Sequence, residues 1–386
     1  MPGENGEKTG NPRLEATALL VSLGVVLVMF LGGCAARQPP ALLDVPAFAG
    51  DAGTTELPAA EQFLAIDDDM RALVTARLGR VRDPLDRLQR LSRLLLDPEQ
   101  LGIRYDSELT LPAREAYRQR AANCLSFSAL LVAMAREAGL DARFQDVPVL
   151  PTWRLAGRVF LVERHVNTLV RVASRKFVVD FRPPDAASWS RAKIIGDANA
   201  IAQYFGNLGV EQLTDDNPGT AYRLFRRGLE VDPRAASLWI NIGVALARNG
   251  QLQEAGQSYR QALALDPRNL SALGNLAGVA ELQGEREQAS ALRARVERLR
   301  RKNPYFMYAQ GEYYLHSGEY PQALAAFRAA VRKAPKEGDF HFALARVYRA
   351  LGDTKLAARS YGAALERAAS DSVRQRYRAR YEAGAD

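Results

Sequence analysis

The second half of the chain repeats itself, and this repetition limits the possible folds more than any other feature of the sequence. From about residue 202 the same pattern of large and small residues returns with a period of about 34 residues. One unit shows the pattern in full, in the order Trp239, Ile242, Gly243, Leu246, Ala255, Tyr259, Ala262 and Pro267. Units of this length are helix pairs that cannot bury their apolar faces alone, so successive pairs must stack into an all-helical array.

Further units align with this one. Those around Gly311 and Leu344 keep most of its positions, a divergent first unit contains Phe205, and a slightly longer middle unit runs from Leu273 to Pro304. The pattern resembles the tetratricopeptide repeat, in which small residues let paired helices approach and large ones fill the gaps between pairs. The resemblance predicts an all-α solenoid of about five repeats over residues 201–368, closed by a polar capping helix and tail over residues 369–386.

A different pattern predicts a buried helix that begins at a cysteine. Asn123 is a good N-cap, because its side-chain oxygen can accept a bond from an amide in the first turn. Apolar residues follow at helical spacing from Phe127 to Ala138, and Gly139 is placed to end the helix. Cys124 would then lie at the positive end of the helix dipole, a position that favours the nucleophilic thiolate.

Two segments downstream supply the partners that such a thiolate needs. The segment that starts at His165 and the segment that ends at Asp180 are rich in β-branched residues and predict an antiparallel hairpin with a turn at residues 173–176. That turn would place Asp180 opposite Leu169, so the register must shift or bulge before the carboxylate can meet the imidazole. By triad logic Cys124 attacks, His165 carries the proton and Asp180 orients the imidazole.

These groups, in this order, resemble the transglutaminase-like superfamily of papain-related cysteine enzymes, in a bacterial branch with C-terminal helical repeats. The resemblance rests on Gly102-Ile-Arg-Tyr105, Asn123-Cys-Leu-Ser-Phe127, Arg136-Glu-Ala-Gly-Leu140, His165-Val-Asn167 and Val178-Val-Asp180-Phe. It implies an α+β papain/transglutaminase-like domain over residues 63–200 with Cys124, His165 and Asp180 as its catalytic residues. The chain departs from the family at Ala122, where glycine is usual, and at Asn167, where an aromatic residue is usual.

The rest of this domain shows weaker patterns. Helices are expected over residues 67–79 and 83–96, and strands over residues 144–149 and 159–162. Three residues near the triad are candidates for lining the cleft: Asn123, Trp153 and Asn167.

The triad implies attack on an amide or ester carbonyl and formation of a thioester. Release of the thioester to water would make the protein a thiol peptidase or amidase that acts on peptide or protein amides, with the repeats recruiting a protein partner. This is the function that we expect from the resemblance. Two alternatives remain open: a catalytically inactive repeat scaffold or adaptor in envelope assembly, and an acyltransferase that releases the thioester to an amine and so cross-links its substrates.

The N-terminal segment indicates export. Residues 16–31 are uncharged and apolar, which is short for a membrane span and typical of a signal peptide. Leu31-Gly32-Gly33-Cys34 resembles the bacterial lipobox, which implies a signal peptide over residues 1–33 and a lipid on Cys34. Residues 34–62 contain much proline and glycine and predict a flexible tether. We therefore expect a lipid-anchored envelope protein at the outer membrane that faces the periplasm; an uncleaved anchor helix is the alternative.

Composition narrows the classes of protein to which the chain can belong. With 386 residues, 47% hydrophobic and 25% charged, the chain can form two or three ordinary globular domains. Cys34 and Cys124 are its two cysteines, so lipidation of the first would leave the second as a free thiol. The sequence shows no phosphate loop, dinucleotide fingerprint or metal-ligand cluster, and we expect no cofactor. Despite the net charge of +8, we expect no nucleic-acid partner for a protein outside the inner membrane.

Replacing Cys34 removes the thiol that the predicted lipid would modify. We expect Cys34→Ala to leave the chain unprocessed and to move it from the membrane to the soluble or inner-membrane fraction, as measured by fractionation and intact mass. Cys124→Ala is the matched control and should fractionate like the wild type. If Cys34→Ala differs in mass from the wild type only by the substituted side chain and fractionates like it, the lipoprotein interpretation is ruled out.

Overall fold

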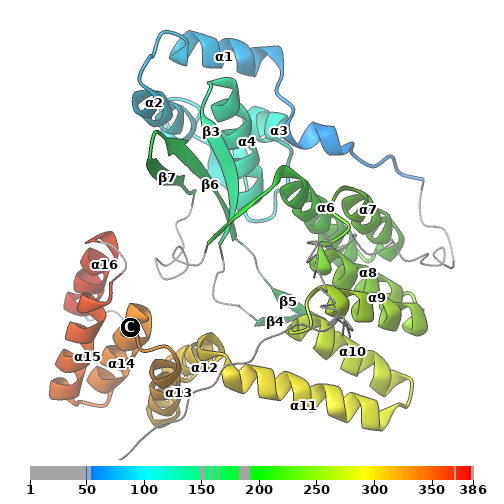
Figure 1. Cartoon of the computed structure of the whole chain (residues 1–386), viewed down its shortest axis with the longest axis vertical. Coiled ribbons are helices and arrows are strands. Elements are labelled where there is room, and N and C mark those ends of the chain that lie inside the picture. Colours follow the sequence, from blue (N-terminus) through cyan, green and yellow to red (C-terminus); the bar gives the residue numbers. More distant parts are fainter. Residues whose placement is uncertain are drawn as a thin grey trace, which may run out of the picture. The chain divides into compact units, whose positions relative to one another are not determined.

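The computed structural model describes residues 49, 54–147, 153–156, 159–162, 165–181, 192–368 and 371–383 (Figure 1). The predicted signal peptide, Cys34 and most of the predicted tether lie outside these residues. No helix in the described part is long and apolar enough to cross a membrane.

The N-terminal domain mixes helices and strands. Its elements are η1 (Ala60–Leu64), α1 (Asp68–Leu78), α2 (Pro84–Leu96), β1 (Arg104–Tyr105), α3 (Ala113–Gln119), β2 (Ala121–Ala122), α4 (Cys124–Glu137), β3 (Asp141–Val147), β4 (Trp153–Ala156), β5 (Val159–Val162), β6 (His165–Val172), β7 (Arg175–Val179) and β8 (Lys193–Ile195). The predicted helices at 67–79 and 83–96 are confirmed as α1 and α2. Each begins after an aspartate, Asp67 or Asp83, whose side chain accepts a bond from a backbone amide in the first turn.

Helix α4 is the centre of this domain. Every residue from Leu125 to Ala135 is buried, because α1, α2 and α3 pack around the helix together with strands β3 and β6. A helix that is apolar on all sides is stable only when it is enclosed in this way. It ends as the sequence predicts, since Gly139 has a φ of 75° and only glycine adopts that conformation without strain.

The main sheet is antiparallel in the order β7-β6-β3-β8. Thr168 pairs with Val179 and Val172 pairs with Arg175, so two residues, 173 and 174, connect β6 to β7. The predicted turn over residues 173–176 is therefore wrong. Ala173 takes a φ of 52° in this tighter turn, which shifts the register by two residues and places Asp180 beside Asn167 instead of Leu169.

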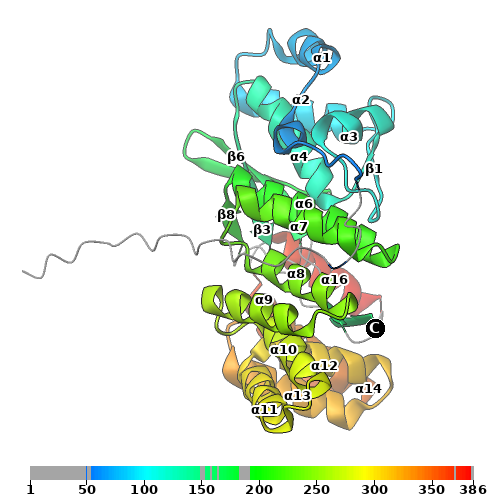
Figure 2. The same ribbon diagram turned by 90° about the vertical axis from the view of Figure 1, so that its right-hand side faces the viewer.

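The helical half of the chain consists of paired helices (Figures 1 and 2). In order they are α6 (Asp197–Thr214), α7 (Pro218–Val231), α8 (Ala236–Arg248), α9 (Leu252–Leu265), α10 (Leu270–Leu282), α11 (Arg286–Lys302), α12 (Pro304–His316), α13 (Tyr320–Lys333), α14 (Gly338–Ala350), α15 (Thr354–Glu366) and α16 (Asp371–Glu382). Five successive pairs from α6/α7 to α14/α15 match the repeats expected from the sequence. The last helix, α16, buries Val373 and Tyr377 against Phe342 of α14.

The first helix of the repeats also belongs to the core of the N-terminal domain. Tyr204 of α6 packs on Phe63 with 5.0 Å between the ring centroids, and Phe63 stacks on Phe144 of β3 at 6.0 Å. At the start of α6, Asp197 accepts two hydrogen bonds from the Arg136 guanidinium of α4, at 2.6 and 2.8 Å. The predicted domain limit between residues 200 and 201 thus falls inside α6.

Small residues set the distance between the paired helices. A Cβ added to Gly243 of α8 would lie 2.4 Å from the ring of Tyr259 of α9. The same contact recurs in other pairs, where a Cβ on Gly209 or Gly311 would lie 2.2 or 2.5 Å from the ring of a phenylalanine. These distances are far below van der Waals contact, so the aromatic ring occupies the space that a larger side chain would need.

Gly243→Ala tests this packing. The added methyl group must displace the buried Tyr259 ring, and we expect a loss of about 1–3 kcal/mol in unfolding free energy. Gly256→Ala in α9 is the matched control, because its methyl group would meet only the tip of Arg260 at 3.5 Å and should stabilise the helix by up to about 1 kcal/mol. Denaturant unfolding of both variants measures the difference, and equal stabilities would contradict the packing role.

Candidate active site

The first turn of α4 positions the cysteine. Cys124 is the first helical residue, and the Asn123 side chain caps the helix by accepting a bond from the Ser126 amide at 2.9 Å. The Asn123 amide nitrogen donates to the Thr110 hydroxyl at 3.0 Å in a buried contact. The N-cap prediction is confirmed. Both ends of the Asn123 side chain are hydrogen-bonded within the fold.

The shifted register brings the predicted histidine and aspartate together. Because Asp180 follows Val179 and so lies beside Asn167, it is the diagonal neighbour of His165, two residues away on the same side of β6. The His165 Nε2 atom lies 2.8 Å from Asp180 Oδ2, and the side chains are only 12% and 3% exposed. This contact satisfies a carboxylate that would otherwise be costly to bury.

The pKa of His165 reflects this environment. Burial lowers it, but hydrogen bonds to Asp180 and Cys124, and the charges of these two groups, outweigh burial and raise the pKa of His165 from 6.5 to about 9. Since Nε2 faces Asp180, the second ring nitrogen, Nδ1, is the one available to the Cys124 thiol. The structure therefore brings all three predicted residues into one chain of interactions, with the imidazole in the middle.

Cys124 is a free cysteine and is partly exposed. A partly exposed thiol next to a cationic imidazole and a helix N-terminus has the environment of a reactive cysteine, whereas a purely structural cysteine is usually enclosed in apolar side chains. The arrangement can hold a thiolate–imidazolium pair and transfer a proton between sulfur and a leaving group.

The other predicted site residues differ in their placement. Asn167 is 1% exposed, and its amide nitrogen donates to the same Asp180 oxygen at 2.9 Å, so it joins the site through the aspartate. Trp153 lies in β4, but its side chain is outside what the structure describes, and its place in the cleft stays a prediction.

Sequence reasoning missed Ser128. Its hydroxyl lies 2.8 Å from the carbonyl of Cys124 and 3.2 Å from the carbonyl of Val166, and so connects the first turn of α4 to the strand that carries His165. The available signal was a hydroxyl residue within an otherwise apolar helix face, one turn after the cysteine. Such a residue is easily taken for a tolerated small side chain.

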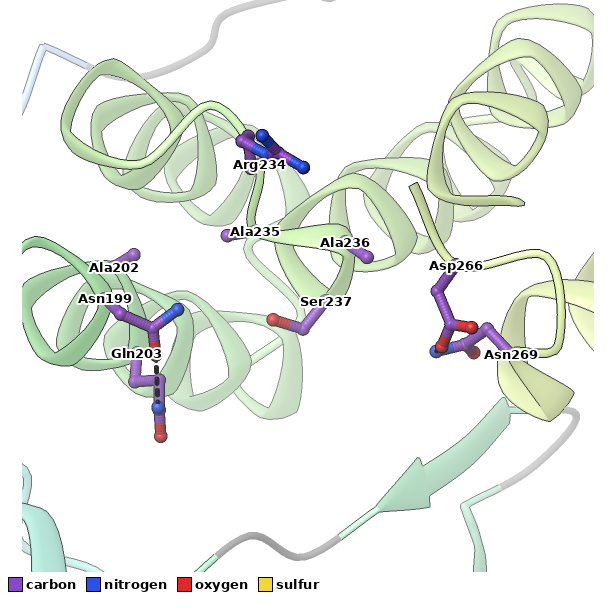
Figure 3. A pocket seen from close by; sticks show the side chains of 9 residues that line it. All are labelled: Asn199, Ala202, Gln203, Arg234, Ala235, Ala236, Ser237, Asp266 and Asn269. Atoms are coloured by element: carbon purple, nitrogen blue, oxygen red, sulfur yellow. Dashed lines mark hydrogen bonds between the residues drawn. The ribbon is translucent and has the colours of Figure 1, made fainter. Parts of the chain in front are cut away.

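Within the described residues, no group of three or more histidine, cysteine or acidic side chains is placed to hold a metal ion. A polar hollow of about 200 Å³ lies among the helices of the first three repeats (Figure 3). It is lined by Asn199, Ala202, Gln203, Arg234, Ala235, Ala236, Ser237, Asp266 and Asn269.

Two models of known protein families match the chain, one in its N-terminal part and one in its C-terminal part. Residues 72–189 match the family model of the transglutaminase-like superfamily core, and residues 197–379 match the model of the tetratricopeptide-repeat C-terminal domain of cilia and flagella-associated protein 70. No curated protein matches the chain. The chain thus contains a transglutaminase-like core domain followed by a tetratricopeptide-repeat domain, as the sequence predicts.

Solved structures similar to this chain are repeat proteins. MamA from Desulfovibrio magneticus RS-1 is 22% identical over 44% of this chain and 95% of its own, with a TM-score of 0.25. PilF from Pseudomonas aeruginosa is 18% identical over 50% and 96%, with a TM-score of 0.27. YrrB, a repeat protein with an unusual peptide-binding site, is 17% identical over 46% and 91%, with a TM-score of 0.25.

The raised pKa of His165 predicts a pH dependence. Because the pKa in the fold, about 9, is above the value of 6.5 for a free histidine, the imidazolium stabilises the fold fully below pH 6.5. This contribution is lost as the pH rises through 9. We expect the His165 ring to titrate near pH 9 by NMR, and at a lower pH in Asp180→Asn, which lacks the paired charge. The chain has three histidines, so His316→Gln and His341→Gln identify the other two signals. A wild-type midpoint near 6.5 would contradict the interaction chain.

Proposed function

We propose that the transglutaminase-like domain is a thiol hydrolase that cleaves amide bonds of peptides or proteins through a thioester. The observation that supports this most directly is the position of His165 between Asp180 and Cys124, with a pKa raised to about 9. A structural histidine in a sheet needs neither a buried carboxylate on one nitrogen nor a partly exposed thiol on the other.

In this mechanism Cys124 Sγ attacks the carbonyl carbon, a C–S bond forms, and the carbonyl oxygen becomes an oxyanion. The backbone N–H of Cys124, at the start of α4, is a suitable donor to that oxygen. His165 gives its proton to the leaving amine, the C–N bond breaks, and a thioester remains. His165 then takes a proton from water, the water oxygen attacks the thioester carbon, and the C–S bond breaks. The carboxylic acid leaves, and the Cys124 sulfur is restored beside the protonated His165.

The repeats provide the second part of the proposal, which is recruitment of a protein or peptide partner. A transglutaminase-like domain joined to tetratricopeptide repeats supports either an enzyme-like protein or a protein-binding scaffold. The polar hollow in the first repeats is our candidate for the peptide site, with the Arg234 and Ser237 side chains among its polar lining. We also propose that a lipid on Cys34 holds the protein in the cell envelope, on the evidence of the lipobox pattern.

Acylation by p-nitrophenyl acetate tests the chemistry without knowledge of the natural substrate. We expect wild-type protein to release a burst of p-nitrophenol and to carry one acetyl group on Cys124 by mass spectrometry. His165→Ala should slow acylation by on the order of 10²–10⁴-fold, because the general base is lost. His341→Ala, in the repeats, is the matched control and should acylate at the wild-type rate. Cys124→Ala should show no burst.

Two further outcomes of the same experiment distinguish the hydrolase from the acyltransferase and from the inactive scaffold. Faster decay of the acetyl-enzyme with added cadaverine, and appearance of acetyl-cadaverine, would indicate the amine-accepting acyltransferase. A Cys124 that reacts no faster than free cysteine and is indifferent to His165→Ala would rule out the enzyme. The scaffold would then be the remaining function, and Cys124→Ala should retain the same partners as wild-type protein in a pull-down.

A further inference from the structure

Asp180 has a second hydrogen-bond donor on the oxygen that binds the histidine. Asn167 Nδ2 lies 2.9 Å from Asp180 Oδ2, and His165 Nε2 lies 2.8 Å from the same atom. All three side chains are largely buried. Two donors therefore converge on one carboxylate oxygen, and they approach it from residues two apart on β6.

The chemistry of the contact fixes the orientation of the asparagine. An ionised carboxylate only accepts hydrogen bonds, so the amide must present Nδ2 and not Oδ1 to Asp180. The buried Oδ1 atom then has no hydrogen-bond partner among the described residues. Leaving a buried acceptor unpaired is unfavourable, and an aliphatic side chain would avoid it. Packing alone gives no reason for an asparagine here, whereas the bond to Asp180 does.

The register explains how Asn167 reaches Asp180. Asp180 is the first residue beyond β7. Asn167 is its direct neighbour across the sheet, whereas His165 is the diagonal one. Backbones of direct neighbours are closer than those of diagonal ones, so the short asparagine side chain can reach the carboxylate that the longer histidine side chain reaches from the diagonal position.

We propose that Asn167 is a positioning residue, whose amide holds Asp180 Oδ2 in line with His165 Nε2 and thereby directs the other ring nitrogen at Cys124. This inference rests on the proposed function, since it assigns Asn167 to the same site. The sequence departs from the transglutaminase-like pattern at this position, so the role belongs to this chain's own residues.

The test uses full-length Asn167→Leu, which keeps the approximate shape of the side chain and removes the amide N–H donor. We expect the titration midpoint of His165, followed by NMR, to fall from about 9 by about one pH unit, the effect of one charge-assisted hydrogen bond. Alkylation of Cys124 by iodoacetamide at pH 8 should slow by about twofold, because the protonated fraction of His165 falls from about nine tenths to about one half.

Thr168→Val is the matched control. Thr168 is fully buried on the same strand, its hydroxyl has no partner among the described residues, and by strand alternation it lies on the face opposite Asn167. Thr168→Val should leave the titration of His165 and the alkylation rate of Cys124 unchanged.

Combination with Asp180→Asn shows whether Asn167 acts through the aspartate. In that background Asn167→Leu should have no further effect on His165 or Cys124. A wild-type midpoint in Asn167→Leu, or an equal loss in both backgrounds, would overturn the proposal. Neither readout requires turnover, so intact coupling in a protein that fails to hydrolyse acyl substrates would reject the proposed function and leave the positioning role standing.

Discussion

Enclosure of α4 on every side is the constraint on which the rest of the structure depends. Each fully buried apolar side chain contributes about 1.5–3 kcal/mol, and this helix buries every residue from Leu125 to Ala135. Only its ends can then reach the surface. Its N-terminal end carries Cys124, so the burial that stabilises the domain also leaves the thiol at the edge of the core, next to the strand with His165. Ser128 connects the helix and that strand by hydrogen bonds.

Hydrogen bonds connect the N-cap residue of α4 to the first helix of the repeats. Asn123 donates to Thr110, and Thr110 in turn forms a hydrogen bond with Glu211 of α6. Burial raises the pKa of Glu211, while the bond to Thr110 opposes this effect. Together with Tyr204 in the apolar core, these contacts make α6 a shared element of the two domains. The first repeat therefore shapes the surroundings of the cysteine, and an N-terminal domain that ended before α6 would expose core aromatic residues.

The sequence was informative wherever a local pattern has one physical solution. The period of about 34 residues, with its recurring small and large residues, predicts stacked helix pairs, and the structure contains them. Asn123 and Gly139 mark the ends of α4 because capping and left-handed geometry are local properties. Strand positions were less certain: β3 begins at Asp141, before the predicted start at residue 144, because pairing with β6 extends it.

By itself, then, the sequence determined the classes of both domains, the helix that carries Cys124, and the choice of His165 and Asp180 as its partners. The tertiary structure decided how these residues meet. A two-residue turn replaced the expected four-residue one, and the resulting register set Asp180 beside Asn167 and within 2.8 Å of His165. Sequence could not decide this, because a shift of two residues keeps every side chain on the same face and so leaves the apolar pattern of the strands unchanged. Only the pairing of one strand with its neighbour distinguishes the two registers.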